Sequence, residues 1–314
     1  MKIVYMGTPD FSVPVLQNLI NDPAYDVVCV VTQPDRPKGR KQKLTASPVK
    51  VLAEQYDIPV LQPEKVRKPE AVAAILAYAP DLLVTAAYGQ ILPQSLLDGP
   101  RLGCINVHAS LLPSYRGAAP IQQAIIDGQK ESGVTIMYMV KKLDAGDILS
   151  QIRVPITDED TFGSLHDKLS AAGSELLMKT LPELEQGRLH PVVQDEDLAT
   201  FAPSIKHEDE KIDWNRPADE IRNLIRGLNP FPGAFTYFEG NVFKIFSALS
   251  SDVKREGTPG LLVRTDDDRL LAAAGDGRWL EIKKCQPAGK KRMGAADFLR
   301  GRELKPGTVL GNRE

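Results

Sequence analysis

Two polar side chains stand out in an apolar stretch of the sequence. The run GCINVHAS, residues 103–110, has the character of a buried strand, yet it carries Asn106 and His108. Because side chains alternate along a strand, residues two apart lie on one face, and their polar ends can meet at one point. An amide can donate a hydrogen bond to a developing oxyanion, and an imidazole can exchange protons near neutral pH. The pair therefore has the groups that acyl transfer needs without a protein nucleophile.

A carboxylate further along the chain is a candidate third member of this site. Asp144 lies in KKLDAGDI, after the apolar run GVTIMYMV, and could reach the same sheet edge as His108. A carboxylate beside an imidazole holds the ring in one orientation. The alternative is that Asp144 is a solvated turn residue before Ala-Gly, and Asp147 competes for the same role. An isolated Asn-x-His is more often a packing pair, so the third group is what favours catalysis.

The elements that would position these groups alternate between short apolar runs and segments with helical spacing. Such alternation is typical of right-handed crossover units, which build a mostly parallel sheet with helices on both faces. The sequence therefore predicts an α/β fold of the Rossmann-like type, in which Asn106 and His108 reach the carboxyl edge where ligands bind. The predicted strands are 2–7, 26–33, 59–63, 81–87, 103–110, 133–140 and 147–156, and the predicted helices are 12–20, 47–57, 69–79, 119–128 and 161–187.

A change of pattern after Gly187 predicts a second domain. Residues 188–214 are polar and rich in proline and acidic side chains, which is typical of a connection. One helical segment, 217–229, then precedes short alternating runs separated by Gly or Asp turns, a spacing typical of a small β-barrel or sandwich. We expect a catalytic domain over 1–189, a linker over 190–207 and a C-terminal domain over 208–314.

The composition of the 314-residue chain is that of an ordinary globular protein. Hydrophobic residues make up 42%, and the net charge is -2 with neutral histidines, so no overall charge excess indicates a partner. We find no signal-peptide pattern and no apolar run of the ~18 residues that a membrane span needs, and we expect a cytoplasmic protein without a membrane partner. Cys29, Cys104 and Cys285 lack disulfide or metal-ligand spacing, and we expect them to be reduced, the first two as packing residues.

Motifs on both sides of His108 form an extended signature. Asn106 is followed by HASLLPSYRGAAPIQQAI and, further along, by DAGDIL, with a looser continuation through KIDWNRPADEIRNLIRGLNPFPGAF to the end. These motifs resemble the 10-formyltetrahydrofolate-dependent formyltransferases. The resemblance implies that Asn106, His108 and Asp144 are catalytic, that 10-formyltetrahydrofolate is the donor, that no metal is required, and that the C-terminal domain is an OB-like barrel. It also implies a folate-contacting loop made of Ser110, Leu111, Leu112 and Pro113.

Further motifs point to one branch of this family. MGTPDFSVPVL, VTQPDRPKGRKQKL, SPVKVLA and AAYGQILP resemble the branch whose acceptor is the α-amino group of methionine esterified to initiator tRNA. The implied reaction moves the formyl group from N10 of the folate to this amine, with Asn106 and His108 stabilising the oxyanion and Asp144 assisting proton transfer. The nearest alternative is a formyltransferase acting on glycinamide ribonucleotide or an amino-sugar nucleotide, which would have no use for a basic RNA-binding surface.

A basic segment early in the chain favours an RNA acceptor. Residues 33–44, QPDRPKGRKQKL, combine five basic residues with one acidic residue, Pro and Gly, which predicts a mobile basic loop near the carboxyl edge of the sheet. The alternative is a solvated loop whose charge keeps the protein soluble. In the resembling family the corresponding loop enters the tRNA acceptor stem, with Arg40 at the matching position. The candidate tRNA-binding residues here are Arg36, Lys38, Arg40, Lys41 and Lys43.

A second basic set lies in the predicted C-terminal domain, where acidic residues are sparse. Such a set lets a near-neutral protein present a positive surface to phosphates, and small barrels commonly bind nucleic acid. We expect initiator methionyl-tRNA and a small-molecule folate as the partners of a monomer. The candidate tRNA-binding residues of this set are Lys290, Lys291 and Arg302.

Two other classes of function fit the sequence less well. The strand at 2–7 opens the chain as in a dinucleotide-dependent oxidoreductase, but the turn after it lacks the second and third glycines of the phosphate-binding fingerprint. A non-catalytic RNA-binding module would leave the convergence of Asn106, His108 and Asp144 unexplained. Formyl transfer is therefore the favoured prediction.

Overall fold

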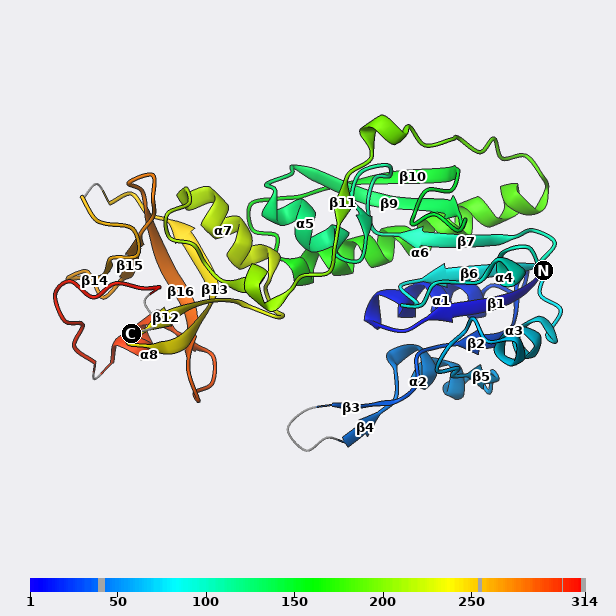
Figure 1. The fold of residues 1–314 in the computed structure, drawn as a ribbon, viewed down its shortest axis with the longest axis horizontal. Coiled ribbons are helices and arrows are strands. Elements are labelled where there is room, and N and C mark those ends of the chain that lie inside the picture. Colours follow the sequence, from blue (N-terminus) through cyan, green and yellow to red (C-terminus); the bar gives the residue numbers. More distant parts are fainter. Residues whose placement is uncertain (39–42, 254–255, 301, 312–314) are drawn as a thin grey trace. The chain divides into compact units, whose positions relative to one another are not determined.

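The structure, a computed structural model, describes residues 1–38, 43–253, 256–300 and 302–311. The chain forms two compact units (Figure 1). Segments 121–130 and 156–165, from the middle of the sequence, group with the C-terminal part. The two units are therefore not consecutive ranges of the sequence. The first unit contains Met1–Pro120, Glu131–Pro155 and His166–Ala202, and the second contains Ile121–Lys130, Ile156–Leu165 and Pro203–Glu314.

A seven-stranded sheet forms the centre of the first unit. Its strands are β1 (Lys2–Gly7), β2 (Asp26–Val31), β5 (Val60–Leu61), β6 (Leu82–Ala86), β7 (Cys104–His108), β9 (Glu131–Tyr138) and β10 (Ile148–Pro155). They lie in the order β10-β9-β7-β6-β1-β2-β5. The five strands from β7 to β5 are parallel, and β9 and β10 are each antiparallel to their neighbours. The prediction of a mostly parallel sheet is confirmed.

Helices cover both faces of this sheet. On one face, Ile75 of α3 (Pro69–Leu76) shares a core with Val4 and Cys104. On the other face, α6 (Phe162–Glu185) approaches β7 so closely that a Cβ on Gly173 would stand 2.9 Å from Val107 Cγ1. Because side chains alternate along a strand, Asn106 and His108 lie on the same face as Cys104. The other helices of this unit are α1 (Val13–Asn21), α2 (Pro48–Gln55) and α4 (Gln94–Leu97), with short 3-10 helices at η1 (Asp10–Ser12) and η2 (Glu196–Leu198). From Ile121 on, α5 (Pro120–Ile126) belongs to the second unit, as does η3 (His207–Glu210).

Two short sheets lie beside the main one. β3 (Arg36–Lys38) pairs antiparallel with β4 (Lys43–Thr45), so the described part of the basic segment forms a hairpin rather than an irregular loop. β8 (Arg116–Gly117) pairs with β11 (Phe201–Ala202), and Val192 forms a bridge with Ile148. Residues 188–202, whose sequence is typical of a free connection, therefore bind back to the first unit through backbone hydrogen bonds. We call this segment the strap.

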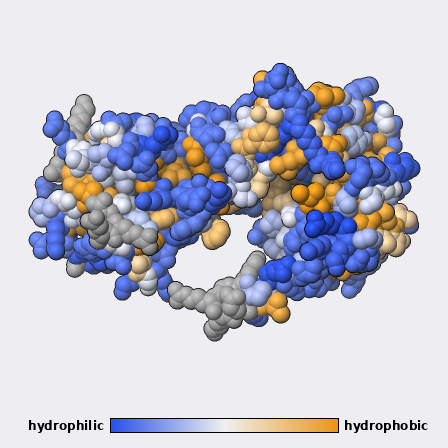
Figure 2. Space-filling view, in the orientation of Figure 1, coloured by the Kyte–Doolittle hydropathy of each residue, from blue (hydrophilic) through white to orange (hydrophobic). Residues whose placement is uncertain are grey.

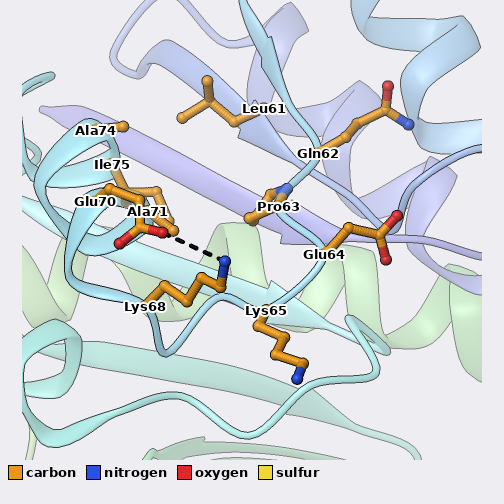
Figure 3. A pocket seen from close by; sticks show the side chains of 10 residues that line it. All are labelled: Leu61, Gln62, Pro63, Glu64, Lys65, Lys68, Glu70, Ala71, Ala74 and Ile75. Atoms are coloured by element: carbon orange, nitrogen blue, oxygen red, sulfur yellow. Dashed lines mark ion pairs between the residues drawn. The ribbon is translucent and has the colours of Figure 1, made fainter.

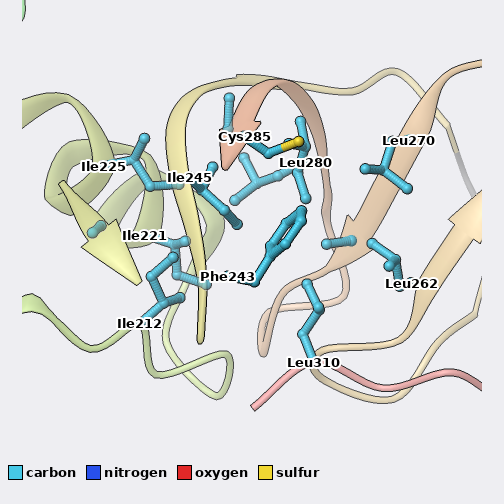
Figure 4. Close-up of a cluster of buried hydrophobic side chains, with 14 of the residues drawn as sticks. Ile212, Ile221, Ile225, Phe243, Ile245, Leu262, Leu270, Leu280, Cys285 and Leu310 are labelled. Atoms are coloured by element: carbon cyan, nitrogen blue, oxygen red, sulfur yellow. The ribbon is translucent and has the colours of Figure 1, made fainter. Parts of the chain in front are cut away.

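An antiparallel sheet forms the second unit. Its strands are β12 (Ala234–Phe238), β13 (Asn241–Ser250), β14 (Leu262–Arg264), β15 (Leu270–Ala273), β16 (Trp279–Pro287) and β17 (Met293–Gly294), and its helices include α7 (Ala218–Gly227) and α8 (Ala295–Leu299). The order is β12-β13-β16-β15-β14, with β17 paired to β16. Ile221 and Ile225 of α7 pack with Phe243 and Ile245 of β13 in its core (Figure 4). The predicted barrel-like C-terminal domain is confirmed.

The cysteines are core residues. Cys29 and Cys104 belong to the core beneath α3, and Cys285 belongs to the core of the second unit (Figure 4). All three are free, and burial raises the pKa of each thiol to about 12. The expectation that the first two are packing residues is confirmed.

The surface is mostly polar. Hydrophilic residues cover most of the face seen in Figure 2, with apolar side chains gathered in smaller patches. Among the described residues, no helix combines the length and the apolar character that a membrane span requires.

Candidate active site

Asn106 lies in the middle of β7, and its amide is held in one orientation. Thr85 of β6 stands opposite Asn106 in the sheet register, and Thr85 Oγ1 donates a hydrogen bond of 2.7 Å to Asn106 Oδ1. Because the hydroxyl occupies the oxygen side of the amide, the Nδ2 group is left to donate elsewhere. Asn106 is only partly buried. Its Nδ2 group can therefore donate to a substrate oxygen at this face of the sheet.

His108 ends β7, two residues further along the same face. The residue is 6% exposed, and Nε2 lies 3.1 Å from the backbone oxygen of Tyr115. A carbonyl oxygen only accepts hydrogen bonds, so Nε2 carries the proton of the neutral ring and Nδ1 is the unprotonated nitrogen. Nδ1 lies 3.8 Å from Asp144 Oδ2. The structure thus brings the predicted imidazole and carboxylate together.

Asp144 is fixed by the turn that carries it. Its φ is +45°, and Oδ2 accepts a hydrogen bond of 2.8 Å from Gly117 N. The turn also passes close to β9, since a Cβ on Gly146 would stand 1.9 Å from the backbone oxygen of Tyr138. The competing candidate, Asp147, uses its backbone oxygen to accept from Tyr138 N at 2.9 Å. Asp144 is therefore the carboxylate that faces the imidazole.

A buried hydrogen-bond network holds this turn from the strap side. Arg116 is fully buried, and its Nε and Nη2 atoms donate to Gln194 Oε1 at 3.1 and 2.8 Å. Gln194 Nε2 in turn donates to the backbone oxygen of Asp144 at 2.8 Å. Because a buried guanidinium without partners is costly, these contacts fix the strap and the turn together. Arg116 and Gln194 are positioning residues for Asp144.

Glu196 is the outer member of the network. It accepts hydrogen bonds from Arg116 Nη1 at 3.0 Å and from Lys142 Nζ at 2.6 Å, and these two bonds lower its pKa to about 2. Sequence reasoning missed the network, because Gln194 and Glu196 lie 78 and 80 residues from Arg116 in a segment without periodic pattern. The one available signal is the place of Arg116 directly after the SLLPSY stretch.

The predicted folate-contacting loop leaves β7 beside the catalytic candidates. Ser110 and Leu112 are buried, and their backbone is held by Thr135, whose Oγ1 donates to Ser110 O at 2.7 Å and accepts from Leu112 N at 3.1 Å. Leu111 and Pro113 are partly exposed. A ligand at this loop would meet the side chains of Leu111 and Pro113, while Ser110 and Leu112 keep the loop in shape.

The basic residues of the first unit lie on and beside the β3–β4 hairpin. Arg36 is exposed, and its Nη2 atom forms an ion pair with Glu64 at 2.8 Å. Lys38 lies in β3, and Lys43 is exposed at the start of β4. The hairpin therefore presents Lys43 to solvent. Two of the predicted residues, Arg40 and Lys41, lie outside the described residues.

The basic candidates of the second unit differ in their surroundings. Lys290 and Lys291 are exposed between β16 and β17. Arg302 pairs with Glu239 at 3.3 Å, and its guanidinium carbon lies 5.2 Å from the centre of the Phe238 ring. Lys290 and Lys291 are therefore more available to a phosphate than Arg302 is.

A pocket of about 380 Å³ lies between the segment after β5 and α3 (Figure 3). Its wall combines the apolar side chains of Leu61 and Ile75 with Lys68 and Glu70, which form an ion pair at 3.5 Å. None of the predicted site residues lines this pocket. Among the described residues, no group of three or more His, Cys, Asp or Glu side chains is placed to hold a metal ion.

Comparison with known families decides the class of protein. The family model described as Formyl transferase matches residues 1–181, and the model described as Formyl transferase, C-terminal domain, matches residues 204–303. The chain belongs to the formyl transferase family. Membership of this family excludes the dinucleotide-dependent oxidoreductase and the non-catalytic RNA-binding module, and it agrees with the resemblance found in the motifs around His108.

Relatives within the family are similar over their whole length. The methionyl-tRNA formyltransferase of Bacillus velezensis is 56% identical over 310 residues, which cover 99% of this chain and 98% of that protein. The methionyl-tRNA formyltransferase of Bacillus subtilis is 54% identical, with 99% and 98% covered.

Solved structures of more distant proteins share the fold. HypX from Aquifex aeolicus, in complex with tetrahydrofolic acid, matches with a TM-score of 0.63 at 18% identity, over 98% of this chain and 49% of that one. An N-formyltransferase from Helicobacter canadensis, in complex with folinic acid and dTDP-3-aminofucose, matches with a TM-score of 0.66 at 18% identity, over 91% and 99%.

Proposed function

We propose that this protein transfers the formyl group of 10-formyltetrahydrofolate to the α-amino group of methionyl-tRNA, giving N-formylmethionyl-tRNA for translation initiation. The acceptor is supported by relatives at 54–56% identity that are methionyl-tRNA formyltransferases over nearly their full length. The donor is supported by family membership and by a fold shared with a protein solved with tetrahydrofolic acid. The observation that carries the chemistry is the convergence of Asn106, His108 and Asp144 at the end of β7.

Formyl transfer requires a hydrogen-bond donor that stabilises the oxyanion of the tetrahedral intermediate. When the neutral amine attacks the formyl carbon, the carbonyl oxygen takes the negative charge. Asn106 Nδ2 is suited to this oxygen, because Thr85 already holds the other end of the amide. A fixed donor stabilises the transition state more than a mobile one, since it needs no reorganisation during the reaction.

The reaction also moves a proton from the attacking amine to N10 of the folate. His108 Nδ1 is the unprotonated ring nitrogen, and it can take this proton while Nε2 stays on the carbonyl of Tyr115. The imidazolium formed is stabilised by the Asp144 carboxylate at 3.8 Å. That distance exceeds a direct hydrogen bond, so a water between the two groups can complete the relay. Transfer of this proton to N10 allows the bond between N10 and the formyl carbon to break, which re-forms the carbonyl on the amine and releases tetrahydrofolate.

The folate would bind at the loop that follows β7, and the RNA would bind at basic residues elsewhere in the chain. Leu111 and Pro113 are the side chains of the Ser110–Pro113 loop available to the folate. The described basic residues Lys43, Lys290 and Lys291 are exposed and suited to phosphates. The catalytic role then belongs to the first unit, which contains most of 1–189 together with the strap, and tRNA binding belongs to the second unit, which contains 208–314. The predicted linker, 190–207, divides between the two units after residue 202. We propose that the protein is a cytoplasmic monomer.

A direct assay tests the acceptor. The purified protein is mixed with 10-formyltetrahydrofolate and with charged initiator tRNA, free methionine or glycinamide ribonucleotide. We expect formylation of the methionyl-tRNA and no comparable rate with the other two amines. Faster formylation of either small amine would overturn the proposed acceptor.

A further inference from the structure

An exposed aromatic ring interrupts the polar surface of the second unit. Phe231 is 74% exposed, in the turn between α7 and β12. The turn packs so closely on Phe246 that a Cβ on Gly233, where φ is +88°, would stand 2.4 Å from that ring. Gly233 N also donates to the backbone oxygen of Leu228 at 2.9 Å. The backbone that carries Phe231 is therefore fixed, while its side chain is free to meet a ligand.

Two cations hold the residues on either side of this ring. Arg292 Nη2 donates to the backbone oxygen of Pro230, and the Arg292 guanidinium carbon lies 3.6 Å from the centre of the Phe246 ring. Lys244 Nζ donates to the backbone oxygen of Pro232 at 2.7 Å. The exposed ring thus lies among positive charges, whereas the centre of a protein-binding patch is apolar and depleted of charged residues.

Two more cations extend this frame. Lys290 and Lys291 are exposed in the turn that leads from β16 to Arg292. Gln286, which lies opposite Lys244 in the β13–β16 pair, donates to the backbone oxygen of Lys290 at 2.8 Å. Among the residues that the structure describes, no carboxylate forms an ion pair with any of these four cations. Their charge is therefore left for an outside partner.

An aromatic ring within a group of cations that form no ion pair with a described carboxylate matches the chemistry of single-stranded nucleic acid. Bases stack on aromatic rings whatever their identity, and Lys and Arg bind the flanking phosphates. We infer that Phe231 stacks on an unpaired nucleotide of the RNA acceptor, while Lys290, Lys291 and Arg292 bind the adjacent phosphates. This inference rests on the proposed function and adds a stacking residue to it.

Replacement of Phe231 separates the contribution of stacking to RNA affinity from the contribution of charge. Phe231→Ala is expected to raise the Kd for methionyl-tRNA about tenfold, or ~1.4 kcal/mol, within the range of base–aromatic stacking. Phe231→Tyr keeps a ring and should bind with wild-type affinity. Leu249→Ala, which truncates a 49% exposed side chain on β13, is the matched control and should also bind like the wild type. Because stacking carries no charge, Phe231→Ala should leave the slope of log Kd against log salt unchanged.

An abasic scan identifies the stacked base. Methionyl-tRNA molecules that each carry one abasic nucleotide at an unpaired position are bound to the wild type and to Phe231→Ala. We expect the tenfold difference to vanish for one abasic position and to persist for the others. A difference that persists at every position, or no loss of affinity in Phe231→Ala, would overturn the inference.

Two further measurements distinguish RNA stacking from self-association and from failure of the proposed function. Sedimentation of the wild type and of Phe231→Ala tests whether the ring meets a second copy of the chain, and self-association lost in the variant would contradict RNA stacking. Wild-type formylation of methionyl-tRNA is measured alongside. Its absence contradicts the proposed function, whereas a normal wild-type rate with unchanged Phe231→Ala affinity contradicts stacking alone.

Discussion

The two sets of candidate functional residues differ in how tightly the protein holds them. At the end of β7, His108 is 6% exposed, and Thr85, Tyr115 and the strap fix the groups around it. In the second unit, Phe231 is 74% exposed, and Lys290, Lys291 and Arg292 beside it are exposed. Proton transfer and oxyanion stabilisation need fixed geometry, whereas charge attraction to phosphates tolerates movement. We therefore expect the first set to control the reaction rate and the second set to control the affinity for RNA.

The largest effect is expected at β7. Asn106→Ala or His108→Ala should lower the single-turnover rate by ~10²- to 10³-fold, because each removes a group that acts on the transition state. Affinity for methionyl-tRNA should stay the same. Rapid-quench measurements at saturating substrate, with circular dichroism to verify folding, check this expectation. Asn241→Ala, at an exposed position on β13, is the control that should keep the wild-type rate.

Loss of the strap contact should have a smaller effect on the same step. Gln194→Ala removes the donor to the backbone oxygen of Asp144, and a hydrogen bond of this kind contributes ~1 kcal/mol, so we expect kcat to fall about fivefold. The KM for tRNA should not change. Gln186→Ala, at an exposed position after α6, is the matched control. A rise in KM with unchanged kcat would show that Gln194 does not act through Asp144.

The cations of the second unit should alter affinity and leave the rate alone. Lys290→Gln with Lys291→Gln removes two phosphate contacts, so we expect the slope of log Kd against log salt to decrease by about two. Saturating tRNA should restore the wild-type kcat. Filter binding over a range of salt concentrations makes the test, and an unchanged slope would remove both lysines from the RNA surface.

The smallest effect concerns stability at low pH. Hydrogen bonds from Arg116 and Lys142 lower the pKa of Glu196 to about 2 from 4.5, so the folded protein favours its carboxylate. This stabilisation is present above pH 4.5 and is lost as the pH falls towards 2. Glu196→Gln should lower Tm at neutral pH. The difference in Tm between this variant and the wild type should decrease as the pH falls from 4.5 towards 2. A difference that does not depend on pH would contradict the ionic role.

The residues that sequence alone could identify are those whose place follows from strand alternation. Asn106 and His108 share a face because they lie two apart in a strand, and the turn after the next antiparallel strand carries Asp144. Contacts such as that of Arg116 with Gln194 could not be predicted, because they join distant segments through side chains in an aperiodic stretch. Phe231 was missed for a related reason, since local pattern does not reveal which apolar side chain stays exposed.

The same principle explains the errors in local structure. The basic segment contains Pro37, which disfavours a strand in the interior of a sheet, yet Arg36–Lys38 pairs with Lys43–Thr45 as an isolated hairpin with two free edges. The strap contains few apolar residues, and its backbone pairing with β8 depends on the fold of the sheet. The alternation of apolar runs and helical segments predicted the main sheet, whereas the hairpin and the strap depend on tertiary contacts.

One double-mutant cycle tests the separation of rate from affinity most directly. Asn106→Ala is combined with Lys290→Gln and Lys291→Gln, and the single-turnover rate and the Kd for methionyl-tRNA are measured for each variant. We predict that the combined protein has the slow rate of Asn106→Ala and the weak binding of the lysine variant, with no coupling between them. A rate at saturating tRNA that depends on the two lysines, or a Kd that depends on Asn106, would contradict the account.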